Sequence, residues 1–395
     1  MQASPFAIQV KDFGEPVQRA LRLDPWLLLA AVGLLTCGVF VLHGATSDDI
    51  PGQPYHYVYR QIAYGVVGLV LMLLLSRFDY SRTREWKAGL YVFTIGSIFA
   101  VFALGGVTRG SKRWINLPFF NFQPSELGKV LLTLALSAFI VDRVRRLQDR
   151  DTTARVMLLA LLPSIMVIAE PDLGSAFVYM IIAATLLFVA GTKWTHFAVL
   201  GTLAVAAVVV VMVAAPAAGV HVLKPYQVDR LTAFLHPTDN PRKEGYQLTQ
   251  SITAIGAGQK TGRGNQATQT KLNFLPEHHT DFVFSVVGEE YGFVGAAVVL
   301  SLFALLIWRS LRILTMAKNL YGMLIAAGIT AMLMFQVFVN VGMTIGIMPI
   351  TGVPLPLISY GGSSVIVTLV ALGLLQSVHA QARELAAAKG RDRLL

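Results

Sequence analysis

Two oppositely charged residues, Glu126 and Lys129, lie within a long apolar stretch of the chain. Their three-residue spacing places them on the same face of a helix, where their side chains can pair. Ionisable groups inside a membrane helix are costly unless they pair or face a polar cavity, which makes both residues site candidates. An ion pair that fastens two helices would explain them equally well, and the residues alone leave both interpretations open.

The stretch LPEHHTDF, residues 275–282, brings several ionisable residue types together. Thr280 could cap a helix that begins here, and Asp281 in its first turn would be stabilised by the helix dipole. On the residues alone, this structural interpretation is favoured over a catalytic one. The adjacent histidines, His278 and His279, lack the spacing of helical metal ligands, so no zinc site is predicted.

Two further pairs of carboxylates lie near apolar stretches. Glu289 and Glu290 are neighbours in the chain, and adjacent helical positions point about 100° apart, so both cannot face one partner. We expect one of them to be an internal hydrogen-bonding anchor. Glu170 and Asp172 flank Pro171, and this turn could be a simple reversal, which is the favoured interpretation, or the rim of a site.

The composition places these residues in a bilayer. The chain is 55% hydrophobic and 14% charged, with a mean hydropathy of +0.61, whereas soluble domains carry roughly 25% charged residues. Ten apolar stretches approach the about 20 residues needed to cross a bilayer. They lie at about residues 25–43, 61–76, 88–106, 124–141, 155–170, 173–191, 196–218, 281–308, 321–346 and 363–382. We therefore expect an all-α polytopic membrane protein with about ten transmembrane helices.

The organisation that follows is a terminal segment (residues 1–24), a transmembrane domain (25–382) and a tail (383–395). One long loop, at about residues 219–280, interrupts the transmembrane domain, and loops of this length usually carry function. The single cysteine, Cys37, lies in an apolar stretch, so no disulfide framework or cysteine-based metal site is expected.

The basic residues predict the orientation. Most lysines and arginines of the short loops fall on the side of the two termini, so both termini are expected in the cytoplasm. The net charge of +10 could indicate a nucleic-acid partner. We expect none, because the basic residues cluster between the apolar segments.

Three basic residues depart from this rule. Arg109, Lys112 and Arg113 fall in a short loop on the predicted external side. An attraction for an anionic substrate would explain their position, and contact with phospholipid headgroups would explain it equally well.

Several motifs, in order along nearly the whole chain, resemble those of the SEDS (shape, elongation, division and sporulation) family, which includes RodA and FtsW. The matching stretches are KRW (112–114), FQPSELGK (122–129), PDLGS (171–175), LPEHHTDF (275–282), GEE (288–290), GVPLP (352–356) and SYGGSS (359–364), together with Gln250-Ser251 and Ala254-Ile255-Gly256. NVGM (340–343) and PITGVP (349–354) look more like RodA, whereas KLNF (271–274) looks more like FtsW. Glu170 stands where these proteins often have an uncharged residue.

The resemblance implies a peptidoglycan glycosyltransferase of the bacterial inner membrane. Such an enzyme takes lipid II from the outer leaflet, joins its sugars for cell elongation and shape, and releases undecaprenyl pyrophosphate. The implied partners are a class B penicillin-binding protein and other membrane proteins of the elongation complex. A lipid II flippase, a division paralogue of the FtsW type and a non-catalytic scaffold remain as alternatives.

The aspartate of the family's His-Thr-Asp-Phe stretch is regarded as essential, and here it is Asp281. A positioned carboxylate that takes the proton of an attacking hydroxyl contributes about 10²–10⁴ in rate. One base suffices for a single displacement with inversion. Cations must stabilise the departing diphosphate, and the candidates are Arg109, Lys112, Arg113 and Lys129. A Mg²⁺ or Mn²⁺ ion could accompany the diphosphate.

The remaining candidates are supporting residues of this expected site. The further substrate contacts are Glu126, His279, Thr280, Ser359 and Ser363. The residues expected to hold the site in shape are Pro276, Glu277, Glu289 and Glu290.

Overall fold

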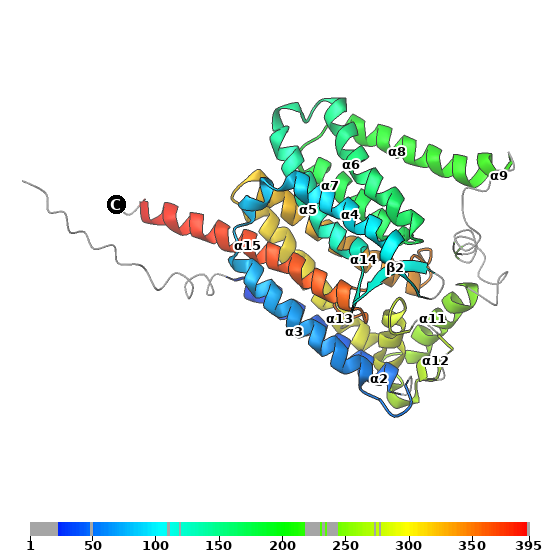
Figure 1. The fold of residues 1–395 in the computed structure, drawn as a ribbon. Helices are drawn as coiled ribbons and strands as arrows, with labels where there is room; N and C mark the ends of the chain where they lie inside the picture. The colour runs from blue at the N-terminus through cyan, green and yellow to red at the C-terminus, as the bar shows by residue number, and fades with distance from the viewer. Residues whose placement is uncertain are drawn as a thin grey trace, which may run out of the picture.

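A computed structural model of the chain describes residues 23–47, 50–108, 111–117, 120–217, 230, 234, 244–271, 274–275 and 278–392. Within these residues, long apolar helices run side by side in one bundle (Figure 1). They are α2 (Pro25–Thr46), α3 (His56–Arg77), α4 (Lys87–Leu104), α5 (Pro124–Asp142), α6 (Arg150–Ala169), α7 (Leu173–Val189), α8 (Trp194–Val209), α13 (Val283–Met316), α14 (Leu320–Thr344) and α15 (Gly362–Asp392).

Nine of these helices are long and apolar enough to cross a membrane within the described part of the chain, when α8 is taken with its helical continuation to Val213. Helix α7 is a shorter apolar helix of 17 residues. Each of the ten predicted stretches coincides with one helix, so the prediction of an all-α polytopic membrane protein is confirmed. The last helix extends beyond the predicted span, because α15 stays helical through residues 383–392.

Short polar residues begin several of these helices. The Asp24 side chain accepts a hydrogen bond from the Leu27 amide at the start of α2, and Asn319 does the same for Gly322 at the start of α14. Such caps satisfy amide groups that have no partner inside the helix. Pro124 occupies the first turn of α5, where its missing N–H costs nothing.

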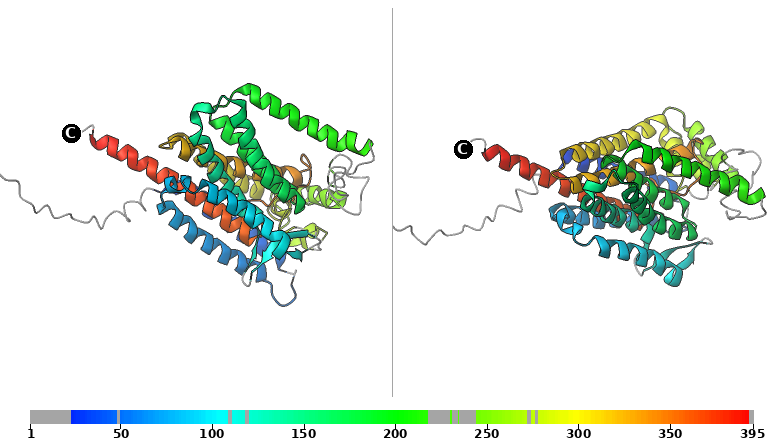
Figure 2. Two further views of the ribbon diagram at one scale, coloured as in Figure 1. Left: turned by 45° about the horizontal axis from the view of Figure 1, so that its top comes forward. Right: turned by 90° about the horizontal axis from the view of Figure 1, so that it is seen from above.

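The helices differ strongly in how much of their surface other helices cover. In α5, α14 and α15, 78%, 72% and 89% of the most apolar window is buried within the protein, against 6% for the span that starts with α8. The first three therefore form the centre of the bundle. Helix α8 lies along its outside (Figures 1 and 2), where its apolar surface suits lipid.

A small sheet, which the sequence did not predict, joins α4 to α5. Strands β1 (Gly106–Thr108), β2 (Ser111–Asn116) and β3 (Asn121–Phe122) pair antiparallel in the order β1-β2-β3. Ile115 pairs with Phe122. The sheet lies at the end of the bundle where α5, α7, α13 and α15 begin, called here the Asp281 end, and it places Arg113 there.

The predicted long loop contains helices in its described part. Helix α11 (Glu244–Gly258), the turn η4 (Gly264–Gln266) and the short α12 (Thr268–Lys271) pack beside the start of α13. Pattern reading missed α11 because its sequence mixes polar and apolar residues and is too short and polar for a membrane span. Its Leu248 joins a small core with Phe282, Met343 and Ile350.

Helix α13 kinks at Gly292, whose φ of 62° and ψ of −158° lie outside the helical region. The kink leaves backbone amides without acceptors inside the helix, and carbonyl groups of the segment after α11 accept their hydrogen bonds. The amides of Phe293 and Val294 donate to the carbonyls of Gln259 and Lys260 at 2.9 and 3.1 Å. A close approach of two backbones of this kind requires glycine at position 292.

Candidate functional site

Asp281 lies in the turn just before α13, half-buried at the Asp281 end of the bundle. Its main-chain carbonyl accepts a hydrogen bond of 2.8 Å from the side-chain amide of Asn340 in α14. The same amide nitrogen donates to the carbonyl of Val353, also at 2.8 Å. Asn340 therefore ties the Asp281 turn to the segment of residues 351–353, called here the 351–353 loop.

The carboxyl of Asp281 faces this loop. A Cβ atom added to Gly352 would lie 3.3 Å from Oδ2 of Asp281 and 3.8 Å from Nη1 of Arg230. The Arg230 guanidinium also lies 3.5 Å from the carbonyl of Thr351. Gly352 has a φ of +72°, which favours glycine on backbone grounds as well. The loop thus brings a carboxyl and a guanidinium close to one glycine.

The residues before Asp281 are held by the segment that leads into α15. The Ser359 hydroxyl donates to the carbonyl of Thr280 at 2.6 Å and accepts from the amide of Leu355 at 2.8 Å. The amide of Tyr360 donates to the carbonyl of His279 at 2.9 Å. Ser359, predicted to contact substrate, is thus engaged inside the protein, and its contacts position the Asp281 turn.

His279, also predicted to contact substrate, is buried beside aromatic rings. Its ring centroid lies 5.1 Å from that of Tyr57 in α3 and 6.2 Å from that of Tyr360. Only 7% of His279 is exposed. Packing of the imidazole against these rings fixes the direction of the turn that carries Thr280 and Asp281.

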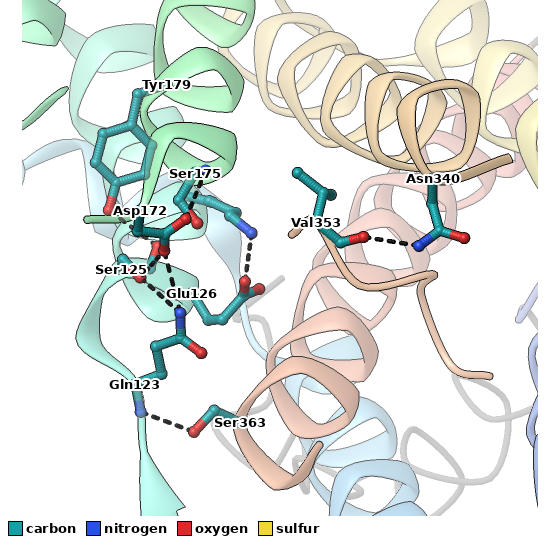
Figure 3. A network of polar contacts seen from close by, with 10 residues as sticks. Gln123, Ser125, Glu126, Asp172, Ser175, Tyr179, Asn340, Val353 and Ser363 are labelled. Atoms are coloured by element: carbon teal, nitrogen blue, oxygen red, sulfur yellow. Dashed lines mark hydrogen bonds and ion pairs between the residues drawn. The ribbon is translucent and has the colours of Figure 1, made fainter. Parts of the chain in front are cut away.

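A second polar group, called here the α5–α7 cluster, consists of Gln123, Ser125, Glu126, Lys129 and Asp172. In Figure 3, Ser125, Glu126 and Asp172 lie on the other side of Val353 from Asn340. Lys129 Nζ lies 2.6 Å from Glu126 Oε1, and the two side chains are 1% and 3% exposed. Both belong to α5, so the pair cannot by itself fasten two helices, which was one of the two interpretations open from the sequence.

Asp172 joins α7 to α5 within this cluster. Its carboxylate accepts hydrogen bonds from Ser125, Gln123 and the Ser175 amide, each at 3.1 Å (Figure 3). Burial acts to raise the pKa of Asp172, but Arg113 and Lys129 outweigh it and hold that pKa below its usual value. Asp172 is therefore a buried carboxylate whose charge is compensated.

Arg113 reaches from β2 to the turn between α6 and α7. Its Nε donates to the carbonyl of Glu170 at 3.2 Å, and its Nη2 donates to the carbonyl of Pro171. The predicted role for Arg113 was to bind the departing diphosphate, and in this structure these two donors hold a turn instead. Lys112 precedes Arg113 in β2, where its backbone pairs with Val107 of β1.

The α5–α7 cluster touches the 351–353 loop through α7. A Cβ atom added to Gly174 would lie 2.3 Å from Cγ2 of Val353 and 3.2 Å from the carbonyl of Thr351. The absence of a side chain at Gly174 therefore lets the loop pack directly on the start of α7. Ser363 adds a link to the residues before α5, since it accepts from the Gln123 amide at 2.9 Å (Figure 3). It also donates to the Asn121 carbonyl at 2.9 Å.

The side chains of Glu289 and Glu290 point toward different neighbours, as adjacent positions on a helix require. Glu289 accepts hydrogen bonds from the amides of Gln269 and Thr270 at 2.9 and 3.0 Å and from the Thr270 hydroxyl at 2.7 Å. It anchors α12 to α13. The Glu290 carboxyl packs instead against Gly44 of α2.

Three predicted residues, Arg109, Pro276 and Glu277, lie outside the described residues. Among those described, no three His, Cys, Asp or Glu side chains gather into a group that could hold a metal ion. Sequence reasoning missed Arg230 and the bridging role of Asn340. The only sequence signal for Asn340 was its place in the RodA-like NVGM run, and nothing marked Arg230 among the other basic residues of its loop.

Comparison with known proteins gives matches over almost the whole chain. Residues 23–384 match the FtsW/RodA/SpoVE family, described as cell cycle proteins. The peptidoglycan glycosyltransferase MrdB of Escherichia coli K12 is 36% identical over 360 residues, covering 91% of this chain and 94% of MrdB. A probable peptidoglycan glycosyltransferase FtsW of Thioalkalivibrio sulfidiphilus is 38% identical over 389 residues, covering 95% and 94%.

A solved structure has a similar fold. It is described as the structural coordination of polymerization and crosslinking by a peptidoglycan synthase complex, and one of its chains matches this chain with a TM-score of 0.75 and 32% identity. That match covers 91% of this chain and 98% of the other.

Proposed function

Since the chain belongs to the FtsW/RodA/SpoVE family, we propose that it is a peptidoglycan glycosyltransferase that polymerises lipid II into glycan strands. The observation that carries this proposal is the placement of the Asp281 carboxyl beside Gly352 and the Arg230 guanidinium. A carboxylate and a cation held against one glycine are the two groups that transfer of a sugar from a diphosphate requires.

The reaction joins two lipid-linked disaccharides. The oxygen of an acceptor hydroxyl attacks the anomeric carbon of the donor sugar, and the bond from that carbon to the diphosphate oxygen breaks. Asp281 takes the hydroxyl proton as the new bond forms, and undecaprenyl pyrophosphate leaves with the electron pair. The configuration at the anomeric carbon inverts, which one displacement with one base accomplishes.

Negative charge grows on the departing diphosphate during this step. A guanidinium can bind two phosphate oxygens at once, and the Arg230 guanidinium lies against the 351–353 loop, beside the glycine that the Asp281 carboxyl faces. Removal of one such preorganised donor typically costs about 10²–10³ in rate. Arg109 and Lys112 remain candidates for the same task.

A Mg²⁺ or Mn²⁺ ion, if one is used, would arrive on the diphosphate. Among the described residues, no three metal-binding side chains lie together. The groups of the protein that can stabilise the departing charge are the cations named above.

The proposed setting is the bacterial inner membrane, with both termini in the cytoplasm and the Asp281 end of the bundle facing outward. The excess of lysine and arginine in the loops at the opposite end supports this orientation. The proposed partner is a class B penicillin-binding protein, supported by the match to a chain of a peptidoglycan synthase complex. The RodA-like run at residues 340–343 favours a role in elongation, and the similarity to an FtsW supports division as the second candidate.

The experiment combines the purified protein, its penicillin-binding partner and fluorescent lipid II in detergent. Glycan longer than the starting disaccharide is the expected product, resolved by gel electrophoresis. A flippase would instead move lipid II across the bilayer of a vesicle and leave its length unchanged. Translocation without any polymer, measured with the same protein in vesicles, would replace this proposal with transport.

A further inference from the structure

Glu170 ends α6, directly before Pro171 and the Asp172 cap of α7. Its side chain is buried, with 1% of the residue exposed, and neither carboxyl oxygen has a hydrogen-bond partner. A buried ionised carboxylate without a donor is strongly disfavoured. The carboxyl must therefore be neutral here, or it must gain a donor when it ionises.

The groups that face Glu170 come from three elements. Asp172 lies in the same turn, Arg113 comes from β2, and Tyr179 comes from α7. Behind Asp172 lie Lys129 and Glu126 of α5, already paired with each other. Burial, with a smaller contribution from Asp172, raises the pKa of Glu170 to about 8, while Arg113 opposes the rise.

Arg113 is the donor that an ionised Glu170 would attract. Its Nε and Nη2 now donate to the main-chain carbonyls of Glu170 and Pro171 rather than to the carboxyl. The guanidinium is thus within a short movement of the carboxylate. Such a movement would release the two carbonyls and free the turn.

The turn is connected to Asp281 by direct contacts. Asp172 caps α7 through the Ser175 amide, and Gly174 packs against Val353 and the Thr351 carbonyl. The residue between these two, Gly352, lies against the Asp281 carboxyl. A shift of the 170–174 segment is therefore transmitted to the 351–353 loop by direct contacts.

We propose that Glu170 is a positioning residue for the polymerisation reaction. In its neutral form it leaves Arg113 on the carbonyls of the turn, so that α7 supports the 351–353 loop against Asp281. When the carboxyl loses its proton to solvent, Arg113 turns to the carboxylate, and the support of Asp281 weakens. Polymerisation then falls as the outer medium becomes alkaline. This inference rests on the proposed function, because it takes Asp281 as the base.

The test is the pH profile of initial polymerisation rates from pH 6 to 9.5, for the complex with the penicillin-binding partner. Glu170→Gln keeps the shape of a neutral carboxyl and cannot ionise. We expect the wild-type rate to fall with a midpoint near pH 8, to roughly one-tenth one unit above it. The Glu170→Gln complex should match the wild type at pH 6.5 and keep its rate at pH 9.

Asp151→Asn serves as the control, because Asp151 is 67% exposed and pairs only with Arg155 at 3.0 Å among the described contacts. Its profile should follow the wild type. Superimposable profiles for Glu170→Gln and the wild type would overturn the proposal, as would an equal loss of rate by Glu170→Gln at every pH.

A second measurement does not need the variant to fold or the enzyme to be active. The infrared carbonyl band of a protonated carboxylic acid, followed in the wild-type protein, should disappear with a midpoint near pH 8. Absence of such a band at pH 6.5 would overturn the neutral state of Glu170. If the wild-type complex forms no polymer at any pH, the proposed function fails, and the infrared titration still decides the ionisation of Glu170.

Discussion

The side-chain amide of Asn340 donates to the main-chain carbonyl of Asp281 and to that of Val353, each at 2.8 Å. One residue of α14 therefore holds the turn that carries the candidate base and the loop that faces its carboxyl. This bridge makes the position of the Asp281 carboxyl a property of the central helices rather than of a surface loop.

Replacing this bridge tests its importance. Asn340→Ala should lower the polymerisation rate about 10²-fold, because small displacements of a reacting group cost that much. The apparent affinity for lipid II should change little. Substrate-dependent initial rates of the complex separate the two effects, and a thermal unfolding midpoint close to the wild type confirms that the bundle is intact. A rate within twofold of the wild type would show that the bridge is dispensable.

Gly352 offers a matched pair of variants. Gly352→Ala puts a Cβ atom 3.3 Å from Oδ2 of Asp281, on a backbone with a φ of +72°. Gly52→Ala adds a side chain at a similar φ of +77°, with nothing within 4 Å. Both should lose about 1–2 kcal/mol of stability from backbone strain. Only Gly352→Ala should also lose polymerisation, at least tenfold, at equal amounts of folded complex.

Variants of the buried pair Glu126 and Lys129 can show whether the pair serves stability alone or also the reaction. Lys129→Met leaves the Glu126 carboxylate buried without its partner, which should destabilise the protein by about 3–5 kcal/mol. The double variant Glu126→Gln with Lys129→Met removes both charges and should recover most of that loss in thermal unfolding. Recovery of stability without recovery of polymerisation would assign the pair to the site. Recovery of both would assign it to the fold.

At the opposite end of the bundle, Asp24 links α2, α13 and α15 through Arg309 and Gln376. Burial acts to raise the pKa of Asp24, but hydrogen bonds from Arg309 and the Leu27 amide outweigh it, and the pKa lies below its usual value of 3.8. A carboxyl whose pKa is lowered by folding stabilises the protein above its unfolded pKa, and that contribution disappears as the pH falls through the folded value.

Asp24→Asn should therefore unfold at a lower temperature than the wild type at pH 7. The difference between the two should shrink as the pH falls below about 4. Thermal unfolding in detergent at several pH values measures it. A difference that stays constant down to pH 3 would show that the Asp24 charge contributes nothing to stability.

The parts of the fold that could be predicted are those that depend on local composition. The ten helices were found because an apolar stretch long enough to cross a bilayer has few other stable forms. Helix α11 was missed because it is too short and polar for a membrane span and packs on the distant α13. The small sheet of β1, β2 and β3 was missed because its strands are only two to six residues long and carry no clear alternation of apolar and polar residues.

The site, too, could be predicted only where it depends on local sequence. Charged residues are rare beside apolar helices, so the sequence singles out Asp281, Glu126 and Lys129. The bridging amide of Asn340 and the approach of Arg230 depend on how α14 and the long loop meet the Asp281 turn, which no spacing in the sequence encodes. Likewise, the engagement of Arg113 with the turn at Pro171 follows from the unpredicted sheet.

One substitution decides whether the Asp281 carboxyl takes the proton of the acceptor hydroxyl. Asp281→Asn keeps the size and hydrogen-bonding shape of the side chain but removes its basicity. With the penicillin-binding partner and fluorescent lipid II, this variant should form no glycan above background, a loss of about 10²–10⁴ in rate, while Asp151→Asn polymerises like the wild type. Polymerisation by folded Asp281→Asn at a rate near that of the wild type would contradict the account.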